Sequence, residues 1–274
     1  MSTENEVLFE RAVGRSPLVI SLPHVGTAIP AEIARRMTPR ARQVEDTDWH
    51  VDRLYRFARV AGASWLQARL SRYVIDLNRP PDDHSLYPGQ ASTGLCPPAS
   101  FSGESLYAAS PPTAAEVGAR RERYWMPYHD ALKLLIAGAR RRHGFAVLLD
   151  AHSIRSVVPR LFAGRLPDIN LGTNDGRSCD PLLAAGLVAQ LATQRDFTHV
   201  LNGRFKGGYI TRTYGEPHAG VHAVQIELAQ AAYMDESGHS FEDSLAEPLR
   251  NLLRSLVAVL AKFRPLGVSP DGSA

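Results

Sequence analysis

The sequence predicts an α/β fold built on a largely parallel or mixed sheet. Short apolar runs typical of buried strands, such as Leu18–Leu22 and Phe145–Leu149, alternate along the chain with segments of helical composition, such as Pro181–Ala192. The chain has 274 residues, of which 44% are hydrophobic, so it can bury a substantial core. Ligands of such sheets gather at the carboxyl ends of the strands. Polar residues at those ends are therefore the first candidates for function.

The first part of the chain is expected to form three strands and two helices. Each predicted strand is a short apolar run. The longer helix has apolar residues at helical spacing and acidic residues near its start, where they favour the helix dipole. The predicted strands are Leu18–Leu22, Trp65–Ala68 and Tyr73–Leu77, and the predicted helices are Pro30–Met37 and Asp48–Val60.

The strongest helix prediction covers Thr113–Arg142, which is rich in Ala, Leu, Arg and Glu. Pro127 should kink this helix, because proline lacks the N–H that the helical hydrogen-bond pattern requires. The segments that follow alternate again between the two kinds of pattern. Further predicted helices are Pro181–Ala192 and Ser240–Lys262, and further predicted strands are Phe145–Leu149, Asp168–Leu171, His199–Leu201, Tyr209–Thr213 and Ala223–Leu228.

We expect a single domain over residues 16–263. Residues 1–15 are predicted to be a flexible N-terminal segment, and residues 264–274 a disordered tail. Residues 79–112 contain seven prolines together with several Gly and Ser, which predicts a long loop. Loops of this length without secondary structure are usually functional or disordered. Our hypothesis is that this loop closes over a bound substrate.

Charge and composition argue against two classes of partner. The net charge of +3 is small and scattered, which does not suggest nucleic acid. No apolar run approaches the ~18–20 residues that span a bilayer, so no membrane segment is expected. Cys96 and Cys179 form no paired motif, and the acidic N-terminal residues contain no signal-peptide core. We therefore expect a cytoplasmic protein. The oligomeric state is not predicted.

Three predicted strands end at a residue that could carry chemistry: His24, His152 and Glu227. Two histidines and a carboxylate are a ligand set for a catalytic zinc, which keeps one position for water. Asp48 and Asp52 are both candidates for the carboxylate ligand. Glu227, at the end of an apolar strand, is costly to bury without a purpose and could act as general base.

Each of these residues also has a purely structural interpretation. A single histidine after a strand is more often a hydrogen-bonded loop residue than a ligand. The acidic cluster around Asp48 would ordinarily be a helix cap and a solvated face. Glu227 could form a salt bridge with one of the many arginines. The equivalent positions of His24 and His152 favour the metal site.

Asn78 and Arg79 follow a predicted strand and form a suitable pair for binding a carboxylate, one through an amide and one through a guanidinium. Arg212 lies close to the Gly207–Gly208 pair, where the main chain can approach a ligand. Several arginines around one pocket suggest a small acidic substrate. The alternative is that they are surface residues.

Seven motifs together resemble the N-formylglutamate amidohydrolases, and they extend from about Ser16 to Met234. Each motif is weak alone, but their number and order are specific. The motifs are PHVG, DTDWH, SRYVIDLNR, YHDAL, LLDAHS, GGYITRTYG and HAVQIELAQAAYM. The family is related to the zinc carboxypeptidases and aspartoacylases. The resemblance implies a three-layer fold, with a mixed, mostly parallel sheet flanked by helices. It also implies zinc-dependent hydrolysis of N-formyl-L-glutamate to L-glutamate and formate, a reaction of histidine degradation.

The resemblance implies that His24 and His152 bind the metal, most simply one zinc ion. In related carboxypeptidases the acidic ligand follows the first histidine as HxxE, but the residues after His24 are Val25–Thr27 and contain no acid. The acidic ligand must come from elsewhere. Our prediction is Asp48, with Asp52 as the alternative.

The remaining roles are also carried over by resemblance. Glu227 resembles the catalytic glutamate, and Asn78 with Arg79 resembles the pair that binds the substrate carboxylate. Arg72 and Arg212 are further substrate-binding candidates by motif position. The expected partner is a small acidic N-acyl amino acid. The alternatives are a succinylglutamate- or aspartoacylase-like amidohydrolase, or a non-catalytic relative that binds a small ligand.

Overall fold

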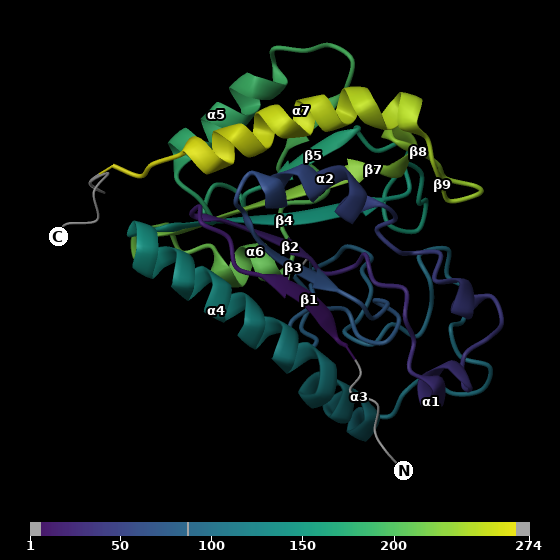
Figure 1. Cartoon of the computed structure of the whole chain (residues 1–274). Coiled ribbons are helices and arrows are strands. Elements are labelled where there is room, and N and C mark those ends of the chain that lie inside the picture. Colours follow the sequence, from purple (N-terminus) through teal and green to yellow (C-terminus); the bar gives the residue numbers. More distant parts are fainter. Residues whose placement is uncertain (1–6, 87, 267–274) are drawn as a thin grey trace.

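The computed structural model describes residues 7–86 and 88–266, and a seven-stranded sheet lies at its centre (Figure 1). The strand order is β1-β3-β2-β4-β7-β5-β6. The four central strands β3, β2, β4 and β7 are parallel, whereas β1 and the β7–β5 pair are antiparallel. The predicted mixed, mostly parallel sheet is thus confirmed. The strands are β1 (Phe9–Ala12), β2 (Leu18–Leu22), β3 (Ser64–Ala68), β4 (Ala146–Ile154), β5 (Ile169–Gly172), β6 (His199–Leu201) and β7 (Val221–Ala229).

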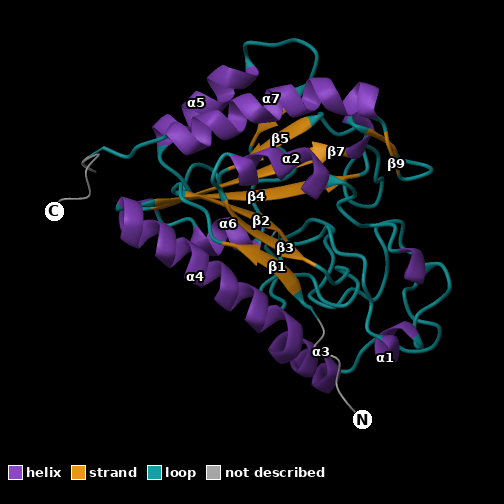
Figure 2. Cartoon of the chain, in the orientation of Figure 1, coloured by secondary structure: helices purple, strands orange, loops and turns teal. Residues whose placement is uncertain are grey.

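Helices cover both faces of the sheet, so the predicted three layers are present (Figure 2). One face packs against α2 (Val51–Val60), α5 (Pro181–Leu191) and α7 (Asp243–Lys262). The other packs against α4 (Met126–His143) and the short α6 (Tyr209–Tyr214). The remaining short helices are α1 (Ala31–Ala34) and α3 (Ala114–Arg120). Within the described residues, none of the helices has the length and apolar character needed to cross a bilayer.

Alternation along β4 and β7 decides which face of the sheet carries the polar residues. Val147 and Leu149 face the core beneath α2, α5 and α7, whereas Ala146 and Leu148 face the core beneath α4. By the same period of two, the next side chains on the α4 side of β4 are those of Asp150 and His152. On β7 the corresponding side chains are Gln225 and Glu227, and the strand register pairs Asp150 with Gln225 and His152 with Glu227. Two adjacent strands therefore present a polar patch on one face.

The structure corrects the expected ends of these two strands. The sequence predicted strands Phe145–Leu149 and Ala223–Leu228, with His152 beyond the first. Instead β4 continues to Ile154 and β7 spans Val221–Ala229, so His152 and Glu227 lie within the ladder. The apolar pattern breaks before the strands end, because side chains that bond to one another can be buried there without being apolar.

The predicted helix Thr113–Arg142 is present as α3 and α4, joined by a π-helical turn over Arg121–Trp125. Thr113 and Glu116 form a capping box at its start. The turn lies directly before Pro127, which has no N–H to donate. The irregularity expected at this proline therefore appears as a local change in helical winding.

Two predicted strands are wrong. Tyr73–Leu77 forms turns, in which the N–H of Val74 donates to Ser71 O and that of Asp76 donates to Leu95 O. Its apolar side chains are buried, but in a loop rather than in the sheet. Tyr209–Thr213 lies in helix α6. Short apolar runs do not distinguish these outcomes, because burial alone sets their composition.

The ends of the domain also differ from expectation. Within the segment predicted as flexible, residues 1–15, Phe9–Ala12 forms edge strand β1, which pairs antiparallel with β3. The helix predicted from Ser240 begins at Asp243, because Ser240–Phe241 (β9) pairs with Met234–Asp235 (β8). Residues 1–6 and the part 267–274 of the predicted tail lie outside the described residues. The described residues of the loop at 79–112 contain no helix or strand.

His129 of α4 holds the turn that carries Asn78 and Arg79. Its ring is fully buried, and Nε2–H donates to Leu77 O at 2.9 Å while Nδ1 accepts from Tyr214 Oη at 2.8 Å. The neighbouring Trp125 stacks on this ring and donates from Nε1 to Arg79 O at 3.1 Å. Helix α4 thus fixes two main-chain carbonyls of the turn from behind.

Burial of His129 should make the stability of the protein sensitive to acid. Desolvation lowers the pKa of its ring to about 3, whereas in the unfolded chain it is about 6.5. Below pH ~6.5 the unfolded chain binds a proton that the folded protein does not bind until the pH nears 3. Above pH ~6.5 the protein therefore has the full stability that neutral His129 contributes. Below that pH the free energy of unfolding falls by up to ~1.4 kcal/mol per pH unit.

We expect a His129→Gln variant to lose stability less steeply than the wild type between pH 6 and pH 4. The measurement is the free energy of unfolding in urea at a series of pH values. His218→Gln, at an exposed histidine, is the control and should keep the wild-type slope. Equal slopes for wild type and His129→Gln would show that His129 does not remain neutral in the fold.

Candidate metal centre and substrate cavity

His24, Asp48 and His152 converge beyond the carboxyl end of β2, and their ligand atoms all lie within 4.8 Å of one another. Asp48 Oδ2 is 2.9 Å from His152 Nδ1 and 3.7 Å from His24 Nδ1. All three side chains are buried. The structure therefore brings together the three residues that the sequence analysis proposed as metal ligands.

Local main-chain geometry brings Asp48 to the histidines. His24 follows strand β2, and the N–H of Asp48 donates to His24 O at 3.0 Å, which joins the two segments directly. His50 has a left-handed backbone, φ 62°, and α2 begins after it at Val51. Asp48 therefore precedes the helix rather than lying in it. Asp52 belongs to the first turn of α2 and is not part of the cluster found in the described residues.

Each histidine faces a second buried carboxylate with its other nitrogen. His24 Nε2 is 2.7 Å from Asp76 Oδ1, and His152 Nε2 is 3.0 Å from Asp150 Oδ1. For His24, a proton on Nε2 that is donated to Asp76 leaves the lone pair of Nδ1 directed toward Asp48. Carboxylates that orient metal-binding histidines in this way are a common feature of metal sites. The sequence analysis did not assign Asp76 or Asp150 a role, although the Asp-x-His spacing of β4 places Asp150 and His152 on one face.

The donor atoms at the centre suit a divalent cation. His24 Nδ1 and Asp48 Oδ1 are buried and make no hydrogen bond within the described residues. Burial would raise the pKa of the Asp48 carboxyl, but the hydrogen bonds and charges of the two histidines hold it well below its usual value. An ionised carboxylate beside two imidazoles is a donor set that zinc accepts.

Arg72 neutralises part of this acidic cluster. Its Nη2 lies 2.6 Å from Asp76 Oδ2, and its Nη1 lies 3.6 Å from Asp48 Oδ1. The guanidinium also packs over the ring of Phe101, 4.7 Å from its centroid. Arg72 lines the cavity, as expected for a substrate-binding candidate, but its charge is shared with two carboxylates of the centre.

The side-chain amide of Asn78 is held between strand β4 and the start of helix α6. Its Nδ2 lies 2.9 Å from His152 Nε2 and donates to Asp150 Oδ2 at 3.1 Å, while its Oδ1 accepts from the N–H of Ile210 at 2.8 Å. Gly208 makes this contact possible, because a Cβ there would lie 2.4 Å from Asn78 Nδ2. The main chain at the start of α6 therefore sets the orientation of the amide.

Glu227 lies beside His152 and is almost fully buried. Burial raises the pKa of its carboxyl to about 8, although the charge of His152 acts in the opposite direction. Gln225 donates from Nε2 to Glu227 Oε2 at 3.1 Å, and Gln225 Oε1 accepts from the N–H of Gly208 at 2.7 Å. The carboxyl group is thus oriented by a neighbour two residues away on the same strand.

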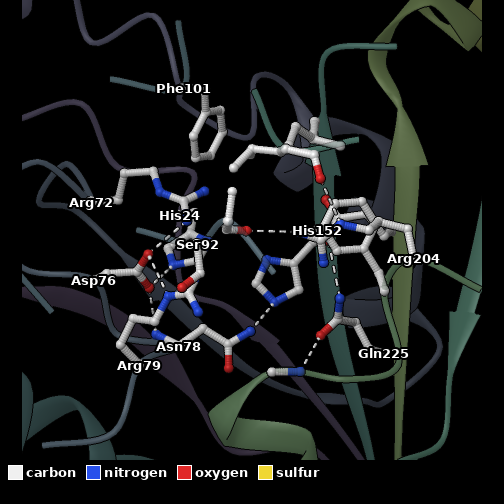
Figure 3. A pocket seen from close by; sticks show the side chains of 16 residues that line it. His24, Arg72, Asp76, Asn78, Arg79, Ser92, Phe101, His152, Arg204 and Gln225 are labelled. Carbon is white, nitrogen blue, oxygen red and sulfur yellow. Dashed lines mark hydrogen bonds and ion pairs between the residues drawn. The ribbon is translucent and has the colours of Figure 1, made fainter. Parts of the chain in front are cut away.

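These residues line a cavity of about 590 Å³, a volume that includes its open mouth. Ala91, Ser92 and Phe101 of the loop at 79–112 line the cavity, and Figure 3 shows Ser92 and Phe101 in its wall. The other lining residues are His24, Arg72, Asp76, Asn78, Arg79, His152, Ile154, Leu161, Arg204, Phe205, Gly208, Gln225 and Glu227.

The third cavity arginine is not the one suggested by the sequence. Arg212 lies on α6, where its Nε donates to Gly207 O at 2.8 Å, and it is not a lining residue of this cavity. Arg204 lines the cavity instead. Arg204 follows β6, which runs opposite to the central strands. The search for polar residues at the carboxyl ends of parallel strands therefore could not predict it.

Comparisons with known proteins place the chain in a family. The profile of the N-formylglutamate amidohydrolase family matches residues 16–234. An N-formylglutamate deformylase from Pseudomonas aeruginosa is 52% identical over 93% of this chain and 96% of its own length. One from Pseudomonas putida is 48% identical over 90% of this chain and 93% of its own length.

Solved structures show the same fold. The crystal structure of an N-formylglutamate amidohydrolase from Ralstonia eutropha superposes with a TM-score of 0.78 at 28% identity, covering 93% of this chain and 96% of that one. A protein from Agrobacterium tumefaciens, at 21% identity, superposes with a TM-score of 0.68 over 92% of this chain and 95% of that one. With the family profile spanning most of the chain and close relatives along its whole length, this protein belongs to the N-formylglutamate amidohydrolase family.

Proposed function

We propose that this protein is a metal-dependent amidohydrolase that converts N-formyl-L-glutamate to L-glutamate and formate. The observation that carries the proposal is the convergence of His24, Asp48 and His152 beside Glu227 in a cavity that also contains arginines. Relatives named N-formylglutamate deformylase support the choice of substrate. In a substrate that has both an amide and carboxylate groups, the amide would lie at the His24, Asp48 and His152 cluster, and the carboxylates would bind to the arginines.

His24, Asp48 and His152 would hold one divalent ion, for which zinc is our choice on the basis of two nitrogen donors and one carboxylate. The unbonded His24 Nδ1 and Asp48 Oδ1 fit such an ion. When bound, it would supply Lewis-acid polarisation of the formyl carbonyl and of the attacking water.

Glu227 is the proposed general base. It takes a proton from the water as the new C–O bond forms at the formyl carbon, and it gives this proton to the amine nitrogen as the C–N bond breaks. Burial raises the pKa of this carboxyl above its usual value, so its carboxylate form is a stronger base toward the water. Gln225 keeps the carboxyl group oriented during this exchange.

Asn78 and Arg79 are the proposed binding site for a substrate carboxylate. Both lie on the turn that His129 and Trp125 hold in place. Because the formyl group is very small, contacts with the rest of the substrate must provide most of the binding energy and orientation. A fixed turn beside the reacting atoms meets that requirement.

The purified protein is expected to contain stoichiometric metal and to release formate from N-formyl-L-glutamate in a chelator-sensitive manner. His24→Ala and His152→Ala should each lose the metal, because each removes one nitrogen donor. Metal analysis and a formate assay provide the measurements, with His218→Ala, an exposed histidine, as control. Full metal content in both site variants would refute the ligand assignment. N-acetyl- and N-succinyl-glutamate, assayed in parallel, test the alternative acyl specificities.

An Asp76→Asn variant is expected to bind the metal about 10- to 100-fold more weakly, because His24 would lose the carboxylate that faces its Nε2. Competition with a chromophoric chelator measures this affinity. Asp82→Asn, at an exposed position of the same segment, should keep the wild-type affinity. An unchanged affinity for Asp76→Asn would show that Asp76 does not orient a ligand.

A Glu227→Gln variant is expected to lose about 10²- to 10⁴-fold in kcat while it keeps its metal, since the substitution removes the base and preserves the shape. Steady-state kinetics with metal analysis test this expectation. Glu216→Gln, at an exposed glutamate, serves as the matched control. Wild-type turnover by Glu227→Gln would rule out the proposed mechanism.

A further inference from the structure

The three arginines that line the cavity have different surroundings. Arg72 forms ion pairs with two carboxylates of the centre itself, at 2.6 Å from Asp76 and 3.6 Å from Asp48. Its charge balances these acids. Arg72 is therefore the arginine least suited to binding a second carboxylate of a substrate.

Arg79 lies on the same side of the cavity as His24 and Asn78 (Figure 3). Its Nε is 3.9 Å from Asp76 Oδ2, and its Nη2 donates to Thr93 Oγ1 at 3.2 Å. Its main-chain carbonyl is held by Trp125. A carboxylate bound here lies next to the residues proposed to act on the amide, so Arg79 suits the carboxylate attached to the same carbon as the amide nitrogen.

Arg204 lies on the other side of His152 from Arg79 (Figure 3). Its guanidinium donates from Nε to Leu161 O at 2.8 Å and from Nη2 to Ala91 O at 2.9 Å, and it stacks over the ring of Phe205. These contacts fix a positive charge in the cavity wall. They also join the loop at 79–112 to the segment around Leu161.

Apolar side chains fill the wall near Arg204. Ile154, Leu161 and Phe205 line this part of the cavity, and they belong to one apolar cluster with Phe101, whose ring faces Arg72. Methylene groups are accommodated by such a wall, and a charged group at their end requires a fixed opposite charge. The cavity thus offers two cationic ends separated by His152 and an apolar surface.

We propose that Arg204 is the specificity residue that binds the side-chain carboxylate of the substrate, while Arg79 binds the α-carboxylate. This inference rests on the proposed function and adds to it the residue that recognises the second carboxylate, at the end of the short aliphatic side chain of the substrate. If Arg204 binds this carboxylate, the protein should discriminate against the analogue with a neutral amide at the same position. The guanidinium of Arg204 would then lack a charged partner in the complex.

The test compares N-formyl-L-glutamate with N-formyl-L-glutamine, which differ only in the charge of the side-chain end. Arg204→Gln should lower kcat/KM for N-formyl-L-glutamate about 10- to 100-fold and change that for N-formyl-L-glutamine by less than about 3-fold. Arg79→Gln should lower kcat/KM for both substrates, because both carry the α-carboxylate. An equal loss on both substrates for Arg204→Gln would mean that Arg204 only joins the loops, and would overturn the proposal.

Arg160→Gln is the matched control for that structural role. Arg160 donates to Ser100 O at 2.9 Å and so also holds the loop at 79–112, but it does not line the cavity. The ratio of kcat/KM between the two substrates should stay at the wild-type value in this variant. A loss of preference in Arg160→Gln equal to that in Arg204→Gln would attribute the preference to loop position and overturn the proposal.

Binding of L-glutamate and L-glutamine, measured by calorimetry on the metal-loaded protein, separates this inference from the proposed function. If the protein releases no formate, the proposed function fails. The inference is still supported if wild type prefers L-glutamate and Arg204→Gln abolishes that preference. It fails if wild type binds both equally, or if Arg204→Gln keeps the preference.

Discussion

Burial of several carboxylates at one edge of the sheet is the constraint around which the site is organised. Asp48, Asp76, Asp150 and Glu227 are all buried, at 7% exposure or less. Charged groups out of water are tolerated only when they are paired and hydrogen-bonded. Each of the three aspartates faces one or both histidines, and Arg72 adds a positive charge to Asp48 and Asp76. Glu227 instead keeps a raised pKa, because burial dominates there.

Two side-chain amides connect this acidic cluster to the rest of the fold. Asn78 and Gln225 each accept a main-chain N–H from the start of α6 with their oxygen, so each directs its nitrogen toward the site. Their nitrogens contact His152 and Glu227 respectively. Glycine is required at position 208, where the main chain passes close to Asn78, since a side chain there would collide with the Asn78 amide. The orientation of His152 and Glu227 thus depends on a segment that contributes no charge.

The sequence predicted the cluster of His24, Asp48 and His152 better than it predicted the residues that line the cavity. His24, His152 and Glu227 stand out because apolar runs lead directly to them, and parallel strands bring their carboxyl ends to one edge. Asp48 could be proposed only together with Asp52, since sequence spacing does not show where the helix starts. Arg212 was predicted because it lies close to two glycines, but the strand expected around it is helix α6. Arg204, which lies in a loop, lines the cavity instead.

The sequence by itself determined most of the central strands and the long helices, the apolar periods that build two cores on either side of the sheet, and the chemical types available at the strand ends. These follow from local composition, because each element must bury one face. Only the tertiary structure decided which carboxylates meet the histidines and which arginines reach the cavity. Asp76 lies far from His24 in sequence and Arg204 lies far from His152, and loops without a periodic pattern place them in the site. Contacts between such loops depend on the packing of the whole chain and leave no local signature.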